Sequence, residues 1–367
     1  MNIPFFNYPE LYNQHREELL RVFDDTASKG AYIMQDELKE FEEKIATYTN
    51  NKYCLGVGNA TDALELLLLA SGLKDGDEVI VSSHTMIATA SAIKFTGATP
   101  VPADIGPDGM MDHSSIENLI TKNTRAIMPT QLNGRICDMD PIQEIANRYN
   151  LDIYEDSAQA LGAKYKGKHI GSFGKGGCIS FYPAKILGCL GDGGAVLCND
   201  EEIYKKIRLM RDHGRDEDGS IKLWGFNSRL DNIQAAILIY YFQSYEETIK
   251  RRRDIAKIYN ENLENINQIR LPPAPDDSGD HYDVFQNYEI QANDRDKLKD
   301  FLQKNGIGTL VQWGGIALHH LGELNMKKEL PLTDAIFNNL LMLPINLAIK
   351  DEDVGYICSK IIEFYDQ

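Results

Sequence analysis

The stretch Ser180-Phe181-Tyr182-Pro183-Ala184-Lys185 places a lysine in a loop between two short apolar strands. The first strand is expected at Cys178 to Phe181. The second is expected at Ala195 to Cys198, after the glycine-rich turn at residues 191–194. Lysine side chains normally stay in water. A lysine held between buried strands loses solvation, so its pKa falls and a free amine becomes available to a carbonyl group. The pattern predicts a reactive Lys185, against the simpler interpretation of a solvated loop lysine.

A carboxylate is expected at the end of another buried strand. Residues 151–156, Leu-Asp-Ile-Tyr-Glu-Asp, have the apolar character of such a strand, and ligand crevices of open α/β sheets lie at the carboxyl ends of strands. A buried carboxylate needs a cationic partner. If Lys185 forms a Schiff base with pyridoxal phosphate, Asp156 is the candidate partner for the protonated pyridine nitrogen of that cofactor.

A candidate phosphate site follows the strand expected at residues 53–57. Residues 57–64, Val-Gly-Asn-Ala-Thr-Asp-Ala-Leu, lead into an apolar helix. Backbone N–H groups at the N-terminus of a helix are a ready phosphate site. Anchors for an amine, an aromatic ring and a phosphate therefore occur together, and they predict a pyridoxal phosphate site.

With these motifs the chain resembles the DegT/DnrJ/EryC1/StrS family of pyridoxal-phosphate-dependent aminotransferases, which aminate nucleotide-linked keto sugars. Six matching segments lie in family order: Gly58 to Leu64, Ser82 to Thr85, Glu155 to Ala160, Ser180 to Lys185 with Gly191 to Ala195, Arg211 to Arg215, and Gly225 to Asp231 followed by Gln234 to Ala236. The resemblance implies an α/β protein of fold type I. Its large domain is built on a mostly parallel sheet, and a smaller α+β domain follows at the C-terminus.

The resemblance also implies roles for single residues. Lys185 and Asp156 are expected to be catalytic: the lysine binds the cofactor and moves a proton, and the aspartate keeps the pyridine nitrogen protonated. Gln159 is expected to contact the 3-hydroxyl of the ring. Met86 stands where family members often carry a stacking aromatic residue. The phosphate contacts implied are Ala60, Thr61, Ser180 and, from the neighbouring subunit of a homodimer, Asn227.

The substrate is expected to be a nucleotide-linked sugar. The segment Val311 to Gly315 resembles the branch that makes 4-amino-4,6-dideoxyhexoses on dTDP. It implies amino transfer from glutamate to a dTDP-linked 4-keto-6-deoxyhexose for surface polysaccharide (O-antigen) or glycan synthesis, with pyridoxamine phosphate as the intermediate cofactor form. A 3-keto-6-deoxy sugar aminotransferase and a non-catalytic, regulatory protein that binds the cofactor or sugar nucleotides stay open. A dehydratase of the family has histidine in place of Lys185.

Composition limits the other partners. The net charge of −17 argues against nucleic acid or an anionic membrane as a partner. No signal sequence and no apolar run near 18 residues is visible, so a cytoplasmic protein is expected. The basic run at residues 250–253 is interpreted as a solvated helix face. The adjacent His319 and His320 cannot face one site on a helix, and no metal site is expected. The six cysteines lack a C-x-x-C pair and are expected to be buried free thiols.

Alternation of strands and helices sets the expected organisation: a large domain at residues 1–245, which includes an N-terminal arm, and a small domain at residues 246–367. In the large domain, helices are predicted at 9–28, 36–48, 61–71, 84–96 and 201–211, and strands at 53–57, 77–82, 100–104, 126–129, 153–156 and 179–181. One or two long helices at 230–263 are expected to carry the chain into the small domain, where strands are predicted at 286–291 and 309–313 and helices at 295–305 and 351–365.

Overall fold

A seven-stranded sheet forms the centre of the computed structural model, which describes residues 2–366. The spatial order is β1-β9-β8-β5-β4-β2-β3. The neighbours from β8 to β3 pair in parallel, and β8 with β9 and β9 with β1 pair antiparallel. The strands are β1 (Tyr53–Val57), β2 (Glu78–Ser82), β3 (Thr99–Ala103), β4 (Thr124–Met128), β5 (Asp152–Asp156), β8 (Gly176–Ser180) and β9 (Gly194–Cys198).

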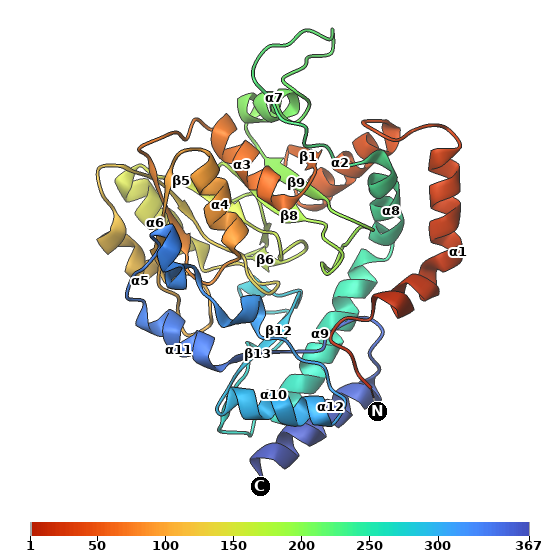
Figure 1. The fold of residues 1–367 in the computed structure, drawn as a ribbon, viewed down its shortest axis with the longest axis vertical. Helices are drawn as coiled ribbons and strands as arrows, with labels where there is room; N and C mark the ends of the chain where they lie inside the picture. Colours follow the sequence, from red (N-terminus) through yellow and green to blue (C-terminus); the bar gives the residue numbers. More distant parts are fainter. Residues whose placement is uncertain (1, 367) are drawn as a thin grey trace.

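Successive residues of each strand face two separate cores, as the pleat of a strand requires. On one face Ile80 and Ile127 pack with α2, α6 and α8, and on the other Val79 and Ala126 pack with α3, α4 and α7. Figure 1 shows α3 and α4 against the sheet. The helices of this lobe are α1 (Tyr8–Ala27), α2 (Asp36–Tyr48), α3 (Ala60–Ala70), α4 (Ile87–Phe95), α5 (His113–Ile116), α6 (Met139–Tyr149), α7 (Glu201–Met210) and α8 (Asn232–Phe242). Because helices cover both faces of a mostly parallel sheet, the predicted α/β architecture is confirmed.

A second, three-stranded sheet with the order β10-β12-β13 forms the core of a smaller lobe, whose strands are β10 (Ile269–Arg270), β12 (Tyr288–Ala292) and β13 (Leu340–Leu343). Its core is shared with α9 (Tyr245–Leu263), α10 (Arg295–Lys304) and α12 (Asp351–Tyr365). Ile3 packs in the same core, and its N–H donates to the carbonyl of Gly306 at 2.7 Å. A third, small sheet joins β6 (Lys164–Tyr165), β7 (Lys168–His169) and β11 (His281–Tyr282).

The start of the chain therefore lies beside α9 and α12, far from the sheet that follows it in sequence (Figure 1). We propose residues 1–245 and 246–367 as the two domains, with the N-terminal arm crossing onto the second. The boundary falls beside the short break between α8 and α9, and α9 then runs from the core of the large lobe into that of the small one.

Two predicted elements differ from the structure. The helix predicted at 84–96 begins only at Ile87, because Met86 is extended at the N-cap position. The strand predicted at 309–313 is wrong: residues Gln312–Gly315 form a 3-10 turn in which Trp313 (φ 47°) and Gly314 (φ 67°) are left-handed. The sequence analysis also missed α11 (Pro331–Asn339) and β13, which contain no turn signal between them.

The basic run at residues 250–253 is only partly a solvated face, so that prediction is wrong for two of its members. Lys250 is exposed and pairs with Asp254, whereas Arg252 and Arg253 are each 7% exposed. A guanidinium N–H of Arg252 donates to the carbonyls of Phe285 and Gln286 at 3.1 and 3.0 Å. The two arginines thus fasten α9 to the segment that enters β12.

The thiol prediction is confirmed, since all six cysteines are buried and free. Among residues 2–366 no helix has both the length and the apolar character needed to cross a membrane.

Candidate active site

A cavity of about 470 Å³ lies at the carboxyl ends of β5 and β8 and at the N-terminal end of α3. Seven of the eight predicted site residues line it: Ala60, Thr61, Met86, Asp156, Gln159, Ser180 and Lys185. Strand ends and a helix start meet there because the parallel strands all point the same way. The structure therefore brings the predicted residues together, with the exception of Asn227.

Lys185 lies in the loop between β8 and β9. The loop is held by Gln286 of the small lobe, which accepts the N–H of Ile186 at 2.9 Å and donates to the carbonyl of Ala184 at 2.8 Å. The side chain of Lys185 is surrounded by protein but lines the wall of the cavity, so that part of its surface is exposed. Burial lowers the pKa of the Lys185 amine to about 8, although the charge of Asp156 acts in the opposite direction.

Asp156 ends β5 and is 5% exposed. Its Oδ2 accepts the hydroxyl of Thr89 at 2.6 Å, and its Oδ1 accepts the N–H of Ala158 at 3.2 Å. The Sγ of Cys178 lies 3.5 Å from Oδ1, and burial raises the pKa of this thiol well above its ordinary value, so that it remains a neutral donor. Asp156 is thus a buried carboxylate whose charge acts on the Lys185 amine.

The other end of the cavity offers unused hydrogen-bond donors. Asn59 caps α3, and its side chain accepts the N–H of Asp62 at 2.9 Å. The N–H groups of Ala60 and Thr61 donate to no acceptor among residues 2–366. Ser180 accepts the N–H of Tyr182 at 3.3 Å, and its own hydroxyl donates to none of these residues. Two amides and one hydroxyl are therefore free for an anion at a helix N-terminus.

Hydrogen bonds also fix the orientation of Gln159. Its Oε1 accepts the backbone N–H of Asn133 at 2.9 Å and the side-chain amide of Asn287 at 3.2 Å. A backbone N–H can only donate, so Oε1 faces Asn133 and the Nε2 amide is left as a donor. Asn287 was not identified from the sequence.

Several cavity residues carried no predicted role, among them Thr85, Thr130, Tyr182, Asp192 and Trp313. Thr85 belongs to a segment that matched the family, and Thr130 follows the end of β4, a signal that could have marked it. Trp313 has a left-handed backbone, which is rare for a large side chain. Its ring packs edge-on against His84, with centroids 5.4 Å apart.

Asn227 is exposed and does not line the cavity of its own chain. It lies near the base of the loop between α7 and α8, where it forms a β-bridge with Asp212; the outer part of that loop extends beyond the rest of the molecule in Figure 1. The next residue, Ser228, turns back and donates to Asp62 at 2.6 Å. The segment is therefore anchored at its base beside α3.

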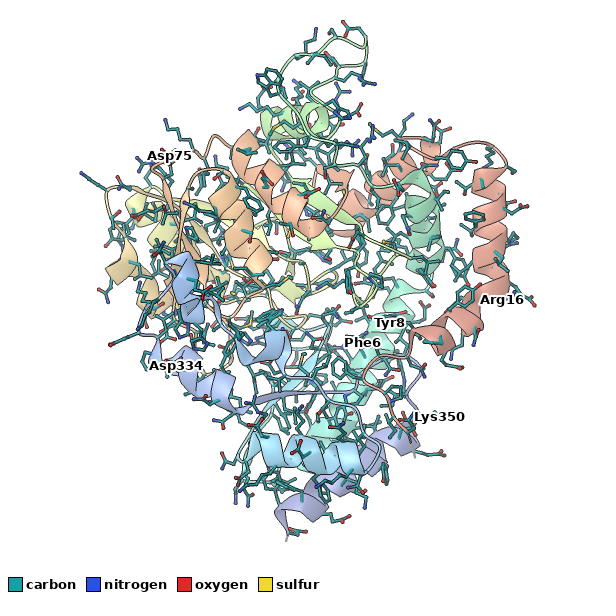
Figure 2. The ribbon with its side chains drawn as sticks, viewed as in Figure 1. Phe6, Tyr8, Arg16, Asp75, Asp334 and Lys350 are labelled. Atoms are coloured by element: carbon teal, nitrogen blue, oxygen red, sulfur yellow. The ribbon has the colours of Figure 1, made fainter. Side chains whose placement is uncertain are left out.

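The adjacent histidines 319 and 320 converge on one carboxylate, contrary to the sequence-based expectation. Their Nε2 atoms lie 2.9 and 2.7 Å from Oδ1 of Asp334, which is on α11 (Figure 2). The helical spacing rule does not apply because Leu318–His320 is a 3-10 turn. The N–H of Ala317 donates to Nδ1 of His320, so Nε2 of that ring carries a proton that a metal ligand must lack. The cluster is a hydrogen-bonded clamp between the turn and α11.

The cavity's donor set fits pyridoxal phosphate. Free amides and a hydroxyl suit a phosphate, a buried carboxylate suits a protonated ring nitrogen, and an amine with a lowered pKa suits a carbonyl group. Together with the α/β fold, these features define an enzyme of the pyridoxal phosphate class, fold type I.

The comparisons identify the family within this class. Residues 13–362 match the model of the DegT/DnrJ/EryC1/StrS aminotransferase family, and the chain belongs to that family of pyridoxal-phosphate-dependent transaminases. The predictions of family, fold type, enzyme class and cofactor are confirmed. No metal or other cofactor is needed for these assignments.

Two relatives and one solved structure illustrate the similarity. A pleiotropic regulatory protein of Geobacillus stearothermophilus is 38% identical over 100% of this chain and 99% of its own. The dTDP-3-amino-3,4,6-trideoxy-alpha-D-glucose transaminase of Streptomyces venezuelae is 36% identical over 94% of this chain and 91% of its own. The crystal structure of S. venezuelae DesV in complex with a ketimine intermediate superposes with a TM-score of 0.95, at 35% identity, and covers 100% of this chain and 99% of that one.

Proposed function

We propose that this protein transfers an amino group from glutamate to a nucleotide-linked keto sugar. The observation that carries the proposal is the cavity in which Lys185, Asp156 and the free N-terminal amides of α3 meet. Family membership supports the reaction class, and the choice of glutamate rests on the resemblance described above.

Each residue has a proposed role. Lys185 Nζ binds the cofactor's carbonyl carbon and moves the proton at the carbon that bears the amino group. Asp156 holds a proton on the pyridine nitrogen. Gln159 donates its Nε2 amide to the 3-oxygen, and Met86 packs on a ring face, as a thioether can. The phosphate is bound by the N–H groups of Ala60 and Thr61 and by the hydroxyl of Ser180.

Pyridoxal phosphate, when bound, supplies the electron sink that makes amino transfer possible. The protein's part is to keep a free amine beside a buried carboxylate. At neutral pH the Lys185 amine, with its pKa near 8, exchanges protons more readily than an ordinary lysine.

The proposed substrate is a dTDP-linked 4-keto-6-deoxyhexose. Its support is the sequence of residues 311–315, where the family often has a His-Tyr pair and this chain has Gln312 and Trp313. Trp313 forms part of the cavity wall, so its indole is in a position to shape the sugar site. The product would be a 4-amino-4,6-dideoxy sugar for surface polysaccharide or glycan synthesis.

Amination at C3 is the second candidate. It is favoured by the similarity to a transaminase named for a dTDP-3-amino sugar, which covers 94% of this chain. A regulatory role is suggested by the name of the Geobacillus relative, but the presence of Lys185, Asp156 and Ser180 in one cavity favours catalysis.

A homodimer with shared sites is proposed as the active unit. Asn227 is exposed, and the cavity of its own chain does not include it. We infer that it reaches the phosphate site of a second copy.

Two assays test the proposal. First, glutamate should convert the bound cofactor, seen as a change in its visible absorption, and Lys185→Ala should not show this change. Second, the converted enzyme should aminate one member of a panel of dTDP-, UDP- and GDP-linked 4-keto and 3-keto sugars, with the position read by NMR and mass spectrometry. No conversion by glutamate or any other amino acid would contradict catalysis, and amination at C3 alone would replace the first candidate by the second.

A further inference from the structure

Three threonine hydroxyls form a continuous hydrogen-bonded chain that ends on Asp156. Thr130 Oγ1 lies 2.8 Å from Thr85 Oγ1, which lies 2.7 Å from Thr89 Oγ1, which lies 2.6 Å from Oδ2 of Asp156. The threonines are 5%, 2% and 0% exposed, and they come from three different segments.

The direction of every bond in this chain follows from the number of hydrogens. A carboxylate only accepts, so Thr89 spends its single hydroxyl hydrogen on Asp156. In the contact with Thr85 the oxygen of Thr89 can then only accept, and Thr85 Oγ1 also lies 3.5 Å from Oδ2 of Asp156 as a second, longer donor. The oxygen of Thr85 accepts from Thr130. All three O–H dipoles therefore point towards the carboxylate. Aligned hydrogen bonds of this kind polarise one another, which strengthens the last bond.

The chain also bears on which form of Asp156 is stable. Hydrogen bonds donated to a carboxylate favour its charged form. If Asp156 were protonated, its carboxyl group would no longer favour three O–H groups that all point towards it. Thr89 would then donate its hydrogen to a neutral and weaker acceptor. Because the threonines belong to the β2–α4 segment, α4 and the end of β4, the carboxylate is tied to three neighbouring elements of the sheet.

We propose that Thr85, Thr89 and Thr130 are positioning residues that hold Asp156 as an oriented carboxylate for the ring nitrogen of the cofactor. The inference rests on the proposed role of Asp156. None of the three threonines has to touch the ring nitrogen. They act through Asp156: Thr89 makes the short contact with Oδ2, at 2.6 Å, and Thr85 makes a longer one with the same atom, at 3.5 Å.

Thr89→Val tests this with a side chain of almost unchanged shape. The holoenzyme is loaded with pyridoxal phosphate labelled with ¹⁵N in the ring, and the chemical shift of that nitrogen reports its protonation directly. We expect Thr89→Val to move the shift towards that of unprotonated pyridine and to slow the half-reaction with glutamate roughly 10-fold, the effect of losing one hydrogen bond to a charged group. The KM for glutamate should stay nearly constant. Thr89→Ser, which keeps the hydroxyl, should restore both readouts.

Thr333→Val is the matched control. Thr333 is 0% exposed and donates to the buried carboxylate of Asp104 at 2.6 Å, the same bond in a place outside the cavity. The Thr333→Val variant should leave the chemical shift of the ring nitrogen unchanged. Thr89→Val could lower the melting temperature more than Thr333→Val does, and then a general loss of stability has to be separated from the loss of the hydrogen bond. In that case Thr85→Val, which removes the next link of the chain, must show the same change of the ring-nitrogen shift.

Asp156→Asn separates this inference from the proposed function. If Asp156→Asn moves the ring-nitrogen shift and Thr89→Val does not, the positioning role is overturned while the role of Asp156 stands. If neither variant moves it, the proposed role of Asp156 fails and the inference fails with it. A shift in Thr89→Val that Thr89→Ser reverses supports the chain.

Discussion

A Cβ atom placed on Gly194 would lie 2.4 Å from the carbonyl carbon of Asn59 and 2.7 Å from the backbone nitrogen of Ala60. The first residue of β9 thus lies directly against the cap of α3, where the free amides begin. Contacts this short with backbone atoms cannot be relieved by a side-chain rotation. A side chain at position 194 must displace the start of α3.

Gly194→Ala is therefore expected to weaken cofactor binding. The cost of overpacking is typically about 1–3 kcal/mol, and here the strain falls on the amides proposed to hold the phosphate. Equilibrium dialysis of pyridoxal phosphate should show a dissociation constant raised by roughly 10-fold or more. Gly355→Ala is the control: it lies in α12 with nothing within 4 Å of its Cβ position, and it should bind the cofactor normally and gain slightly in stability. Unchanged affinity in Gly194→Ala would contradict the phosphate site.

Lys185 should react with the cofactor at a lower pH than any other lysine. Burial lowers the pKa of its amine to about 8, so the free-amine form rises as the pH passes through that value. In cofactor-free protein, covalent attachment of pyridoxal phosphate, trapped with borohydride and mapped by peptide analysis, should occur at Lys185 with a rate midpoint near pH 8. Because the charge of Asp156 raises this pKa, Asp156→Asn should move the midpoint lower. Label on a different lysine would disprove the assignment.

Asp156→Asn should lose most activity and still bind the cofactor. An amide cannot hold the proton on the pyridine nitrogen, so the rate should fall by on the order of 10² or more, as when a tuned acid–base partner is removed. The proposed phosphate anchors at Ala60, Thr61 and Ser180 are untouched by this change, so the bound cofactor should remain measurable by absorbance. Turnover close to that of the unmodified enzyme would refute the role.

The parts of the site that depend on local order were predictable from the sequence. A lysine between strands, a carboxylate at a strand end and a turn before a helix are each visible within one short stretch of sequence. The bounds of α2, β1 and α12 were predicted to the residue, since each has a regular apolar pattern. Such signals need no knowledge of the tertiary fold.

The parts that depend on distant segments were not predictable. Asn287 fixes Gln159 from 128 residues away, and Thr130 joins Thr85 from 45 residues away. The left-handed backbone at Trp313 turned an expected strand into a tight turn. In each case tertiary contacts override local propensity.

A buried carboxyl group outside the site should make stability depend on pH. Glu289 of β12 has a side chain 9% exposed, and its Oε1 lies 3.8 Å from Nε2 of His84. Burial raises the pKa of Glu289 to about 8 and lowers that of His84 to about 4, so both are neutral near pH 6 in the folded protein. An unfolded chain ionises the glutamate near pH 4.5. Between about pH 5 and 8 the folded state thus binds the extra proton, and its stability falls as the pH rises.

Glu289→Gln removes the carboxyl group that binds the extra proton in the folded state, and with it this contribution to the pH dependence of stability. Denaturant unfolding should give equal stabilities for variant and parent near pH 5 and a growing advantage for the variant up to pH 8, by at most about 1.4 kcal/mol per pH unit. His84 is present in both proteins, so its own titration largely cancels in the comparison. A difference that stays constant across this range would show that Glu289 is ionised in the folded protein.

The last prediction concerns Asn227 and the proposed shared site. If Asn227 completes the phosphate site of a second subunit, a two-fold dimer contains two composite sites. Asn227→Asp places a carboxylate beside the phosphate and should bind the cofactor poorly, whereas Asn262→Asp, an exposed change on α9, should bind it normally.

Mixing inactive Lys185→Ala subunits with Asn227→Asp subunits should then restore activity. In a mixed dimer one site combines an intact Lys185 with an intact Asn227 from the other subunit, and the second site carries both defects. Free exchange of equal amounts makes half of the dimers mixed, so the recovered activity should approach about a quarter of that of the unmodified enzyme. If Asn227 acts only within its own subunit, every site keeps one defect and mixing restores nothing. Activity measured after subunit exchange, with the dimer confirmed by light scattering, decides between the two arrangements.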